Sequence, residues 1–145
     1  MRYAIYEPTP PGAASYLKKY LENKVVYDLG AGYGEFAAEM YKYAKRVVAV
    51  ESDPHIAIQY PWKGIECIEN DFMQVDLKEA EVIFVFLSFV GMYALTRKLI
   101  KDNWHGIVIS HYYSLQNLDT RPMPPSEVIV AEIDGGAIPF LIYKL

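Results

Sequence analysis

Apolar residues along the chain follow two alternating patterns. Short runs rich in Val, Ile and Tyr, with few polar interruptions, indicate strands that are buried on both faces. The predicted strands span 24–29, 46–51, 65–68, 82–87 and 106–111. Between them, apolar residues recur every three or four positions, which indicates amphipathic helices. The predicted helices span 10–22, 35–44, 54–59 and 90–101. This alternation predicts a parallel sheet with helices on both faces.

The N-terminal segment is expected to be extended and then helical. Pro8 pushes the residue before it out of the helical region. Pro10 and Pro11 suit the first turn of a helix, and Thr9 is the predicted N-cap. Residues 1–22 are therefore expected to form a cap segment and a helix.

The C-terminal segment breaks the strand–helix alternation. Strand-like runs at 127–133 and 138–143 flank Asp134-Gly135-Gly136, which is a strong signal for a hairpin turn. We therefore expect a single Rossmann-like α/β domain over residues 1–145. Its sheet is predicted to have seven strands, mostly parallel, and to end in an antiparallel hairpin.

A glycine-rich loop follows the first predicted strand and precedes a helix. Such a loop lets the backbone approach a ligand closely and directs amide groups toward it. Gly30, Gly32 and Gly34 form G-x-G-x-G, whereas a dinucleotide fingerprint would need its third glycine at Glu35. With Asp28 before it, the loop resembles motif I of class I S-adenosylmethionine-dependent methyltransferases. A terminal hairpin is also typical of that class, and the resemblance implies that an acidic residue beside the loop holds the ammonium group of the cofactor.

Two further acidic positions follow predicted strands at the same edge of the sheet. Glu51, followed by Ser52, is placed to accept hydrogen bonds from the ribose hydroxyls of the cofactor. The family resemblance places Asp71 against the adenine amino group and Phe72 against the adenine ring. The predicted cofactor is S-adenosyl-L-methionine. The alternative is that the loop is an ordinary tight turn, Glu51 a solvated strand end and Asp71 part of a simple turn.

The whole chain also resembles small archaeal protein-lysine methyltransferases, related to the enzyme that acts on the ATP synthase c subunit. The matching segments are Tyr6-Glu7-Pro8-Thr9-Pro10, Val26-Tyr27-Asp28-Leu29-Gly30, Asn70-Asp71-Phe72, Phe86-Leu87 and Ser110-His111. The resemblance implies that Tyr6, Pro8 and Thr9 fold over the methionine end of the cofactor. Two features depart from it, because the segment at 52–64 is short and Tyr112 occupies an acidic position of the family.

The candidate catalytic residues are Phe86, Ser88 and His111. Phe86-Leu87-Ser88 occupies the place where many amino-methyltransferases carry Asn/Asp-Pro-Pro-Tyr, whose polar group grips a planar base nitrogen. Its absence favours a lysine amine over a nucleic-acid base, and Phe86 is expected to contact the cofactor as well. His111 could act as a base, although a histidine that ends a strand is more often structural.

Charge and composition narrow the expected partners. The net charge of −4 argues against general phosphate-backbone binding. Arg97, Lys98 and Lys101 could form a local basic patch, but a solvated helix face explains them more simply. The single cysteine, Cys67, rules out an internal disulfide and a Cys-based zinc site, and no metal is expected.

The chain lacks an apolar run long enough to span a bilayer, and its start does not resemble a signal peptide, so a cytoplasmic location is expected. The leading hypothesis is a protein-lysine methyltransferase whose partner is a protein that presents lysine. Under this hypothesis DNA is not a partner, RNA is unlikely to be one, and the chain is a monomer or weak oligomer. Two alternatives remain open: a methyltransferase for RNA or a small molecule, and a non-catalytic cofactor-binding protein.

Overall fold

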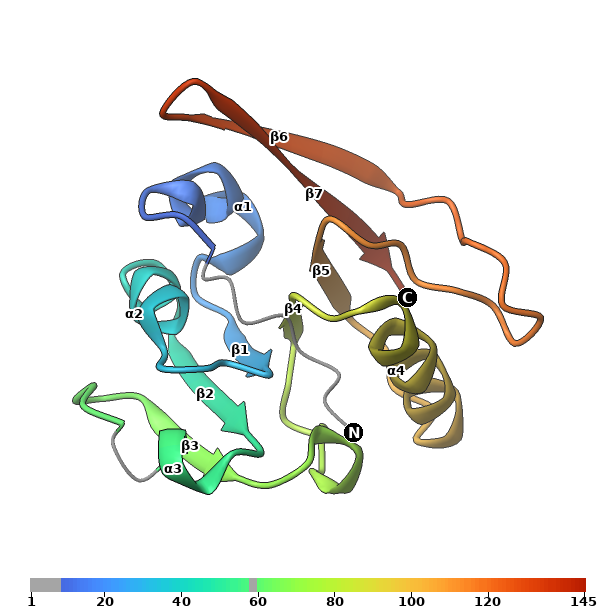
Figure 1. Cartoon of the computed structure of the whole chain (residues 1–145), viewed down its shortest axis with the longest axis horizontal. Coiled ribbons are helices and arrows are strands. Elements are labelled where there is room, and N and C mark those ends of the chain that lie inside the picture. Colours follow the sequence, from blue (N-terminus) through green and yellow to red (C-terminus); the bar gives the residue numbers. More distant parts are fainter. Residues whose placement is uncertain (1–8, 58–59) are drawn as a thin grey trace.

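The computed structural model describes residues 9–57 and 60–145. Its centre is a seven-stranded sheet with the strand order β3-β2-β1-β4-β5-β7-β6 (Figure 1). The strands are β1 (Val25–Leu29), β2 (Arg46–Glu51), β3 (Glu66–Glu69), β4 (Val82–Val85), β5 (Ile107–His111), β6 (Glu127–Ile133) and β7 (Gly136–Lys144). Strands β1 to β5 are parallel, and β7 runs antiparallel to both β5 and β6. The predicted fold class is therefore confirmed.

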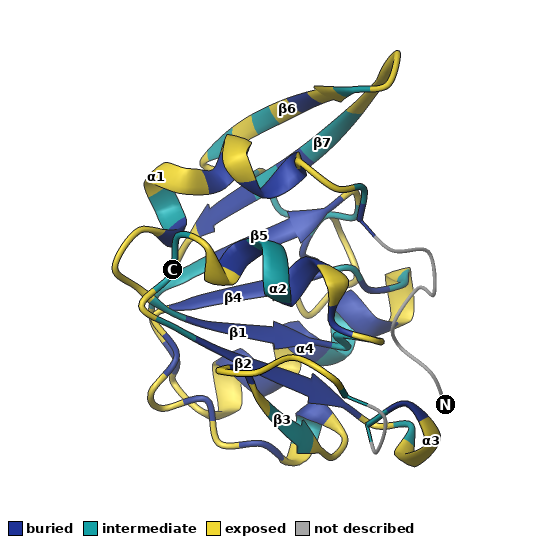
Figure 2. Cartoon of the chain, turned by 90° about the vertical axis from the view of Figure 1, so that its left-hand side faces the viewer, coloured by how far each residue is buried: buried dark blue, intermediate teal, exposed yellow. Residues whose placement is uncertain are grey.

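Helices cover both faces of the sheet. They are η1 (Ala13–Leu17), α1 (Lys18–Leu21), α2 (Glu35–Tyr41), α3 (Pro54–Ala57), η2 (Phe72–Gln74) and α4 (Phe89–Lys101). On one face η1 and α2 bury Leu17 and Met40 in one apolar cluster, and on the other α4 buries Leu95 in a second. Between these layers the central strands are buried almost throughout, as Figure 2 shows. No helix in the described residues is long and apolar enough to cross a membrane.

The N-terminal helix differs from its prediction. A 3₁₀ turn, η1, begins only at Ala13 and leads into the short α1. The residue that caps it is Gly12, whose φ of 89° lies in the left-handed region, so the chain turns after the prolines and the helix starts late. Thr9 is therefore not the N-cap, and its hydroxyl group instead pairs with His111. Tyr16, which lies in η1, is 42% exposed.

The C-terminal hairpin forms as its turn residues predict. Ile133 pairs with Gly136, which leaves Asp134 and Gly135 as a two-residue turn. Their φ angles are 51° and 78°, and a type I′ turn needs positive values at both positions. The hairpin places β7 against β5, and η1 packs against β6.

The strand order fixes where a ligand can bind. From β1 the chain runs outward through β2 to β3, and then returns to place β4 on the other side of β1. In open α/β sheets, ligands bind outside the carboxyl ends of the strands at such a reversal. The loops after β1, β2, β4 and β5 therefore define the candidate site.

Candidate cofactor and substrate site

The glycine loop after β1 has the backbone geometry that its sequence predicts. Gly30, Gly32 and Gly34 have φ values of 80°, 60° and 85°, a region that other residues rarely adopt. The N–H groups of Gly30 and Ala31 donate to the carbonyl of Val50 at 2.8 and 3.0 Å, which fixes the loop to β2. A Cβ atom at Gly32 would meet nothing within 4 Å, so a ligand can approach the backbone there.

Tyr60 packs against the end of the same loop. A Cβ atom built on Gly34 would lie 2.1 Å from the Tyr60 hydroxyl oxygen, so this position needs glycine for space as well as for its φ angle. The hydroxyl group is buried and has no hydrogen-bond partner among the described residues. Burial, with the charge of Asp28 second, raises the pKa of Tyr60. Sequence reasoning missed Tyr60, because a tyrosine beside Pro61 in an irregular segment has no periodic neighbours.

Glu51 ties the end of β2 to the glycine loop. Its side chain is almost completely buried. Oε1 accepts a hydrogen bond from the Gly32 N–H at 2.8 Å, and Oε2 accepts one from the Asp53 N–H at 2.8 Å. Each carboxylate oxygen has two lone pairs, so each can accept a second hydrogen bond. Glu51 can therefore hold the loop and accept ligand hydroxyl groups together.

Asp28 is a buried acid that no positive charge faces within the described part of the chain. Its side chain lies at the end of β1 and is 3% exposed. Among the described residues it has no hydrogen-bond partner. Burial, with the charge of Glu51 second, raises the pKa of Asp28 to about 8. Because an unpaired buried carboxylate is costly, a cation bound beside Asp28 would relieve the penalty.

The loop after β3 holds the predicted adenine contacts. Asp71 is exposed, and its Oδ1 accepts a hydrogen bond from the Met73 N–H at 2.9 Å, which caps η2. Phe72 is buried and belongs to the apolar cluster under α4. Because Glu51 pairs with Glu69, the loop that follows β3 lies at the same edge as Glu51. Ser52 is exposed there.

Phe86 and His111 meet at the ends of β4 and β5. Val85 pairs with Ser110, so the next residue of each strand stands beside the other. The ring centroids of Phe86 and His111 are 3.9 Å apart, and Nδ1 of His111 lies 3.0 Å from the hydroxyl oxygen of Thr9. Burial lowers the pKa of His111 to about 4, so the imidazole is neutral at neutral pH.

Ser88 and the tyrosines after β5 complete the edge. The Ser88 hydroxyl accepts a hydrogen bond from the Gly91 N–H at 3.2 Å and so caps α4. Tyr112 is 59% exposed and has a φ of 85°, an unusual value for a bulky residue that often marks a functional site. Its ring packs edge-on against the ring of Tyr113, with the two ring centroids 4.7 Å apart. Of the other predicted cofactor contacts, Tyr6 and Pro8 lie outside the described residues.

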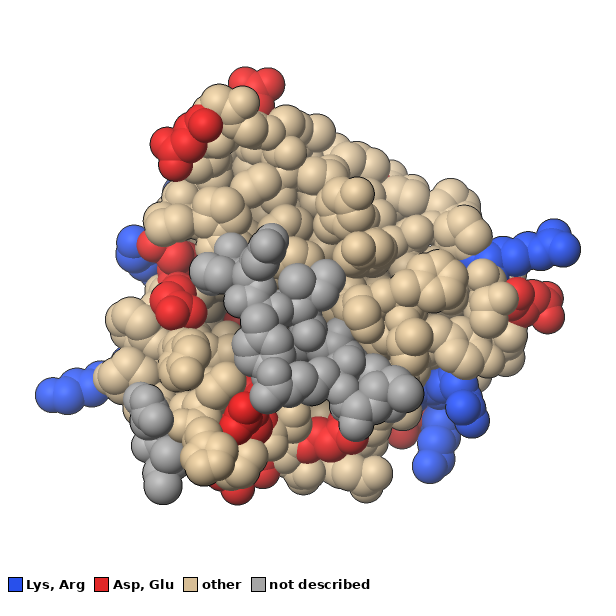
Figure 3. Space-filling view, viewed as in Figure 1, with Lys and Arg blue, Asp and Glu red and all other residues tan. Residues whose placement is uncertain are grey.

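Charge is distributed unevenly on the face shown in Figure 3. Lys and Arg side chains stand at its periphery, whereas several Asp and Glu side chains lie closer to its middle. Over 9–57 and 60–145, no group of three or more His, Cys, Asp or Glu side chains is placed to hold a metal ion. Among the coloured side chains of this face, the acidic ones therefore lie nearer the middle than the basic ones.

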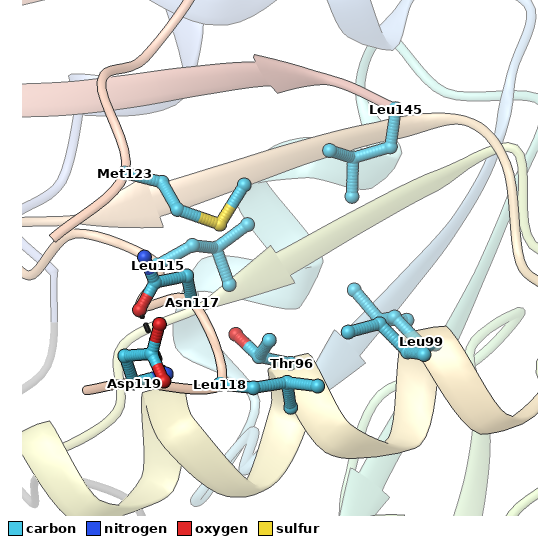
Figure 4. A pocket seen from close by; sticks show the side chains of 9 residues that line it. Thr96, Leu99, Leu115, Asn117, Leu118, Asp119, Met123 and Leu145 are labelled. Carbon is cyan, nitrogen blue, oxygen red and sulfur yellow. Dashed lines mark hydrogen bonds between the residues drawn. The ribbon is translucent and has the colours of Figure 1, made fainter. Parts of the chain in front are cut away.

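A separate hollow of about 410 Å³ lies between α4 and the loop that follows β5 (Figure 4). Its walls are mainly apolar and include Leu99, Leu115, Leu118 and Met123. None of the predicted cofactor or catalytic residues lines it. It therefore does not belong to the site at the strand ends.

Comparison with protein-family models assigns the chain to a family. The family model for ribosomal RNA adenine dimethylase matches residues 13–105, which is more than half of the chain. The chain belongs to this family. The matched part runs from η1 to the end of α4 and includes the glycine loop, Glu51 and Phe86.

Individual relatives point the same way. The probable ribosomal RNA small subunit methyltransferase A of Thermococcus onnurineus is 36% identical over 103 residues, covering 68% of this chain and 38% of the relative. The protein of the same name from Methanosphaera stadtmanae is 30% identical over 87 residues, covering 55% of this chain and 32% of the relative. The match thus spans about a third of the length of these curated relatives.

A solved structure supports the fold. The RNA methyltransferase from Salinibacter ruber, in complex with S-adenosyl-L-homocysteine, has a TM-score of 0.76 and 20% identity, covering 95% of this chain and 93% of that one. The predicted class I methyltransferase fold is confirmed. The predicted cofactor agrees with the demethylated donor bound in that relative.

The predicted partner needs correction. The expectation of a protein substrate, with RNA unlikely, is wrong, because the family and its curated relatives are ribosomal RNA methyltransferases. Two observations misled the prediction. Net charge averages over the whole surface and says little about one site. The missing polar group at Phe86 was interpreted as preference for a flexible amine, although a base can also be held by neighbouring strands.

Proposed function

We propose that this chain is an S-adenosyl-L-methionine-dependent methyltransferase that acts on RNA, with the exocyclic amine of adenine in ribosomal RNA as the acceptor. Membership of the ribosomal RNA adenine dimethylase family over residues 13–105 carries the proposal. The acceptor follows from chemistry, because the exocyclic amine is the adenine nitrogen that can take two methyl groups and keep the ring aromatic.

The residues at the strand ends fit the proposed cofactor. The unpartnered Asp28 carboxylate suits the ammonium group of the methionine tail. Glu51 has lone pairs for the ribose hydroxyls beyond the two backbone groups it already binds. Gly32 leaves open space for the ligand beside the loop. Asp71 remains the proposed contact of the adenine amino group, and its second oxygen would accept that hydrogen bond.

Positioning and exclusion of water are the proposed contributions of the protein to the reaction. When bound, the cofactor supplies an electrophilic methyl group on its sulfonium. The chain holds the cofactor through Glu51 and Asp28 and presents the apolar ring of Phe86 to the acceptor base. An aromatic surface at this place can stack on a base that has left its helix. Alignment of acceptor and methyl group then accounts for most of the rate.

Transfer of a labelled methyl group tests the proposal. The purified chain is incubated with S-adenosyl-L-methionine carrying a tritiated methyl group, together with either protein-free ribosomal RNA or RNA-free cell protein. Label that enters the RNA, and is lost with Glu51→Ala, is the expected result. Label that enters only the protein fraction overturns the RNA assignment. If neither the RNA nor the protein becomes labelled, the assignment of a methyltransferase activity is overturned for both substrates.

A further inference from the structure

The chain belongs to a family of base methyltransferases, yet Phe86 carries no polar group to meet the acceptor amine. The residue that follows β4 carries an apolar ring that contacts His111, and the hydroxyl group of Ser88, two residues later, caps α4. A base amine placed beside Phe86 would therefore meet no acceptor on that side chain, and Ser88 already accepts one hydrogen bond. Because a buried N–H group without a partner costs free energy, a side-chain acceptor on the neighbouring strand would favour binding of the amine.

We propose that His111 supplies it: Nε2 of its imidazole accepts the hydrogen bond, and then the proton, of the base amine during methyl transfer. This inference rests on the proposed function. His111 ends β5, the strand next to β4, and the pairing of Val85 with Ser110 places His111 beside Phe86. The ring centroids are 3.9 Å apart, so a base stacked near Phe86 lies within reach of the imidazole edge.

Thr9 orients the imidazole for this role. The Thr9 hydroxyl is buried and lies 3.0 Å from Nδ1, so that nitrogen is engaged by the protein. When Nδ1 carries the proton and donates it to the hydroxyl oxygen, Nε2 carries a lone pair. Nε2 has no hydrogen-bond partner in 9–57 or 60–145. The opposite edge of the ring is thus left for the substrate.

The surroundings keep the ring neutral. His111 contacts the aromatic rings of Phe86 and Phe140, neither of which titrates. Burial lowers its pKa, and no charged group among the described residues contributes to the shift. The imidazole is therefore an acceptor rather than a cation throughout the neutral pH range.

The step balances without a further reactant. The amine nitrogen forms a bond to the methyl carbon while the carbon–sulfur bond breaks, and the sulfur keeps that electron pair as a neutral thioether. The nitrogen is left with a positive charge and loses its proton to Nε2. The protonated imidazole, which is unfavourable in an apolar site, then passes the proton to water. A positioned acceptor of this kind contributes roughly 10²- to 10⁴-fold to a rate.

The test replaces the acceptor and then restores one from the neighbouring strand. His111→Ala is expected to lower kcat for RNA methylation about 100-fold, with the Kd for S-adenosyl-L-methionine unchanged. Thr9→Val is also expected to lower kcat, and Thr9→Ser, which keeps the hydroxyl group, is expected to lower kcat less than Thr9→Val does. In the His111→Ala background, Phe86→Asn returns a polar acceptor to the end of β4 and is expected to recover at least about tenfold of the loss.

The outcomes separate this inference from the proposed function. If the wild-type chain methylates RNA and His111→Ala leaves kcat unchanged, the role of His111 is overturned and the function stands. If His111→Ala weakens cofactor binding as much as turnover, and Phe86→Asn recovers nothing, His111 is structural and the inference is overturned. If the wild-type chain does not methylate RNA, both are overturned.

Discussion

At the residue scale, the Asp28 carboxyl group links stability to binding. In the folded chain its pKa is about 8, whereas an unfolded aspartate titrates at about 3.9. Between these two pH values the folded state binds a proton that the unfolded state does not. A rise in pH across this window therefore lowers the free energy of unfolding.

Asp28→Asn removes this proton equilibrium and should stabilise the chain. Its Tm is expected to exceed the wild-type value by about 4 °C or more at pH 9, and the difference should shrink as the pH falls toward 4. Thermal unfolding followed by circular dichroism at both pH values measures it. The same variant should bind S-adenosyl-L-methionine more weakly, because it cannot pair with an ammonium group. An equal Tm difference at both pH values contradicts this account.

Glu51 is the second test at this scale. Glu51→Gln keeps the shape of the side chain. The carboxylate accepts hydrogen bonds from two backbone N–H groups, and the amide NH₂ of glutamine would instead face one of these donors. Affinity for S-adenosyl-L-methionine, measured by isothermal titration calorimetry, is expected to fall by about tenfold or more. Glu132→Gln, on an exposed position of β6, is the matched control and should bind as the wild type does. Equal affinity of the two variants would remove Glu51 from the cofactor site.

The sequence predicted the positions of these residues along the strands but not their surroundings. The spacing of Gly30, Gly32 and Gly34 after a strand predicted the loop, and Glu51 followed from its place at the end of β2. The isolation of Asp28 and the burial of the Tyr60 hydroxyl depend on how distant segments pack. No local pattern carries that information.

At the element scale, two glycines of one loop serve different purposes. Both have positive φ, so alanine at either position strains the backbone by roughly 1–2 kcal/mol. At Gly34 the new methyl group also meets the Tyr60 ring, whereas at Gly32 it enters open space. The structure therefore separates a glycine that packs against Tyr60 from a glycine that faces open space.

Gly34→Ala is expected to lower the free energy of unfolding more than Gly32→Ala does, as measured by urea denaturation. The extra cost arises from the contact with Tyr60. In a Tyr60→Ala background, Gly34→Ala should therefore lower the free energy of unfolding by an amount close to that of Gly32→Ala in the wild-type chain. Gly32→Ala is expected to impair cofactor affinity more than its small loss of stability explains. Equal stability losses for the two single variants would show that Tyr60 does not constrain the loop.

Elements were predictable where local chemistry decides them. The hairpin was predicted because Asp134 and Gly135 tolerate the positive φ that a two-residue turn needs. The first helix was mispredicted at its start, since Pro10 and Pro11 suit a helical turn but Gly12 turns the chain the other way. The short η2 was not predicted, because its capping by Asp71 resembles an ordinary turn in the sequence.

At the scale of the whole molecule, the placement of the basic side chains limits how RNA can be held. The Lys and Arg side chains coloured in Figure 3 lie at the periphery of the face shown. An RNA substrate would therefore be held mainly by stacking and base contacts, with few phosphate contacts. Exposed aromatic side chains such as Tyr112 and Phe89 are available for stacking.

Salt dependence tests this mode of binding. For single-stranded RNA each phosphate contact adds about −0.7 to the slope of log affinity against log salt concentration. With about three phosphate contacts or fewer, the slope should be no steeper than about −2. Fluorescence anisotropy with a labelled RNA oligonucleotide measures it between low and moderate salt. A slope of about −5 or steeper would show that a basic surface, not stacking, dominates binding.

The fold at this scale was predictable, but the partner was not. Strand–helix alternation and the closing hairpin determine the sheet, and both are visible in the sequence. The short matches to protein-lysine methyltransferases pointed to the wrong class of partner. The match to the ribosomal RNA adenine dimethylase family over 13–105 and the curated relatives corrected this prediction.

The most direct test of the central claim is nucleoside mass spectrometry after reaction. Protein-free ribosomal RNA is incubated with the chain and S-adenosyl-L-methionine, digested to nucleosides and analysed for methylated adenosine. Adenosine methylated at its exocyclic amine, formed by the wild type and by Glu132→Gln but not by Glu51→Ala, is the predicted result. RNA that gains no methylated nucleoside, while the wild-type chain binds S-adenosyl-L-methionine normally, would contradict the account.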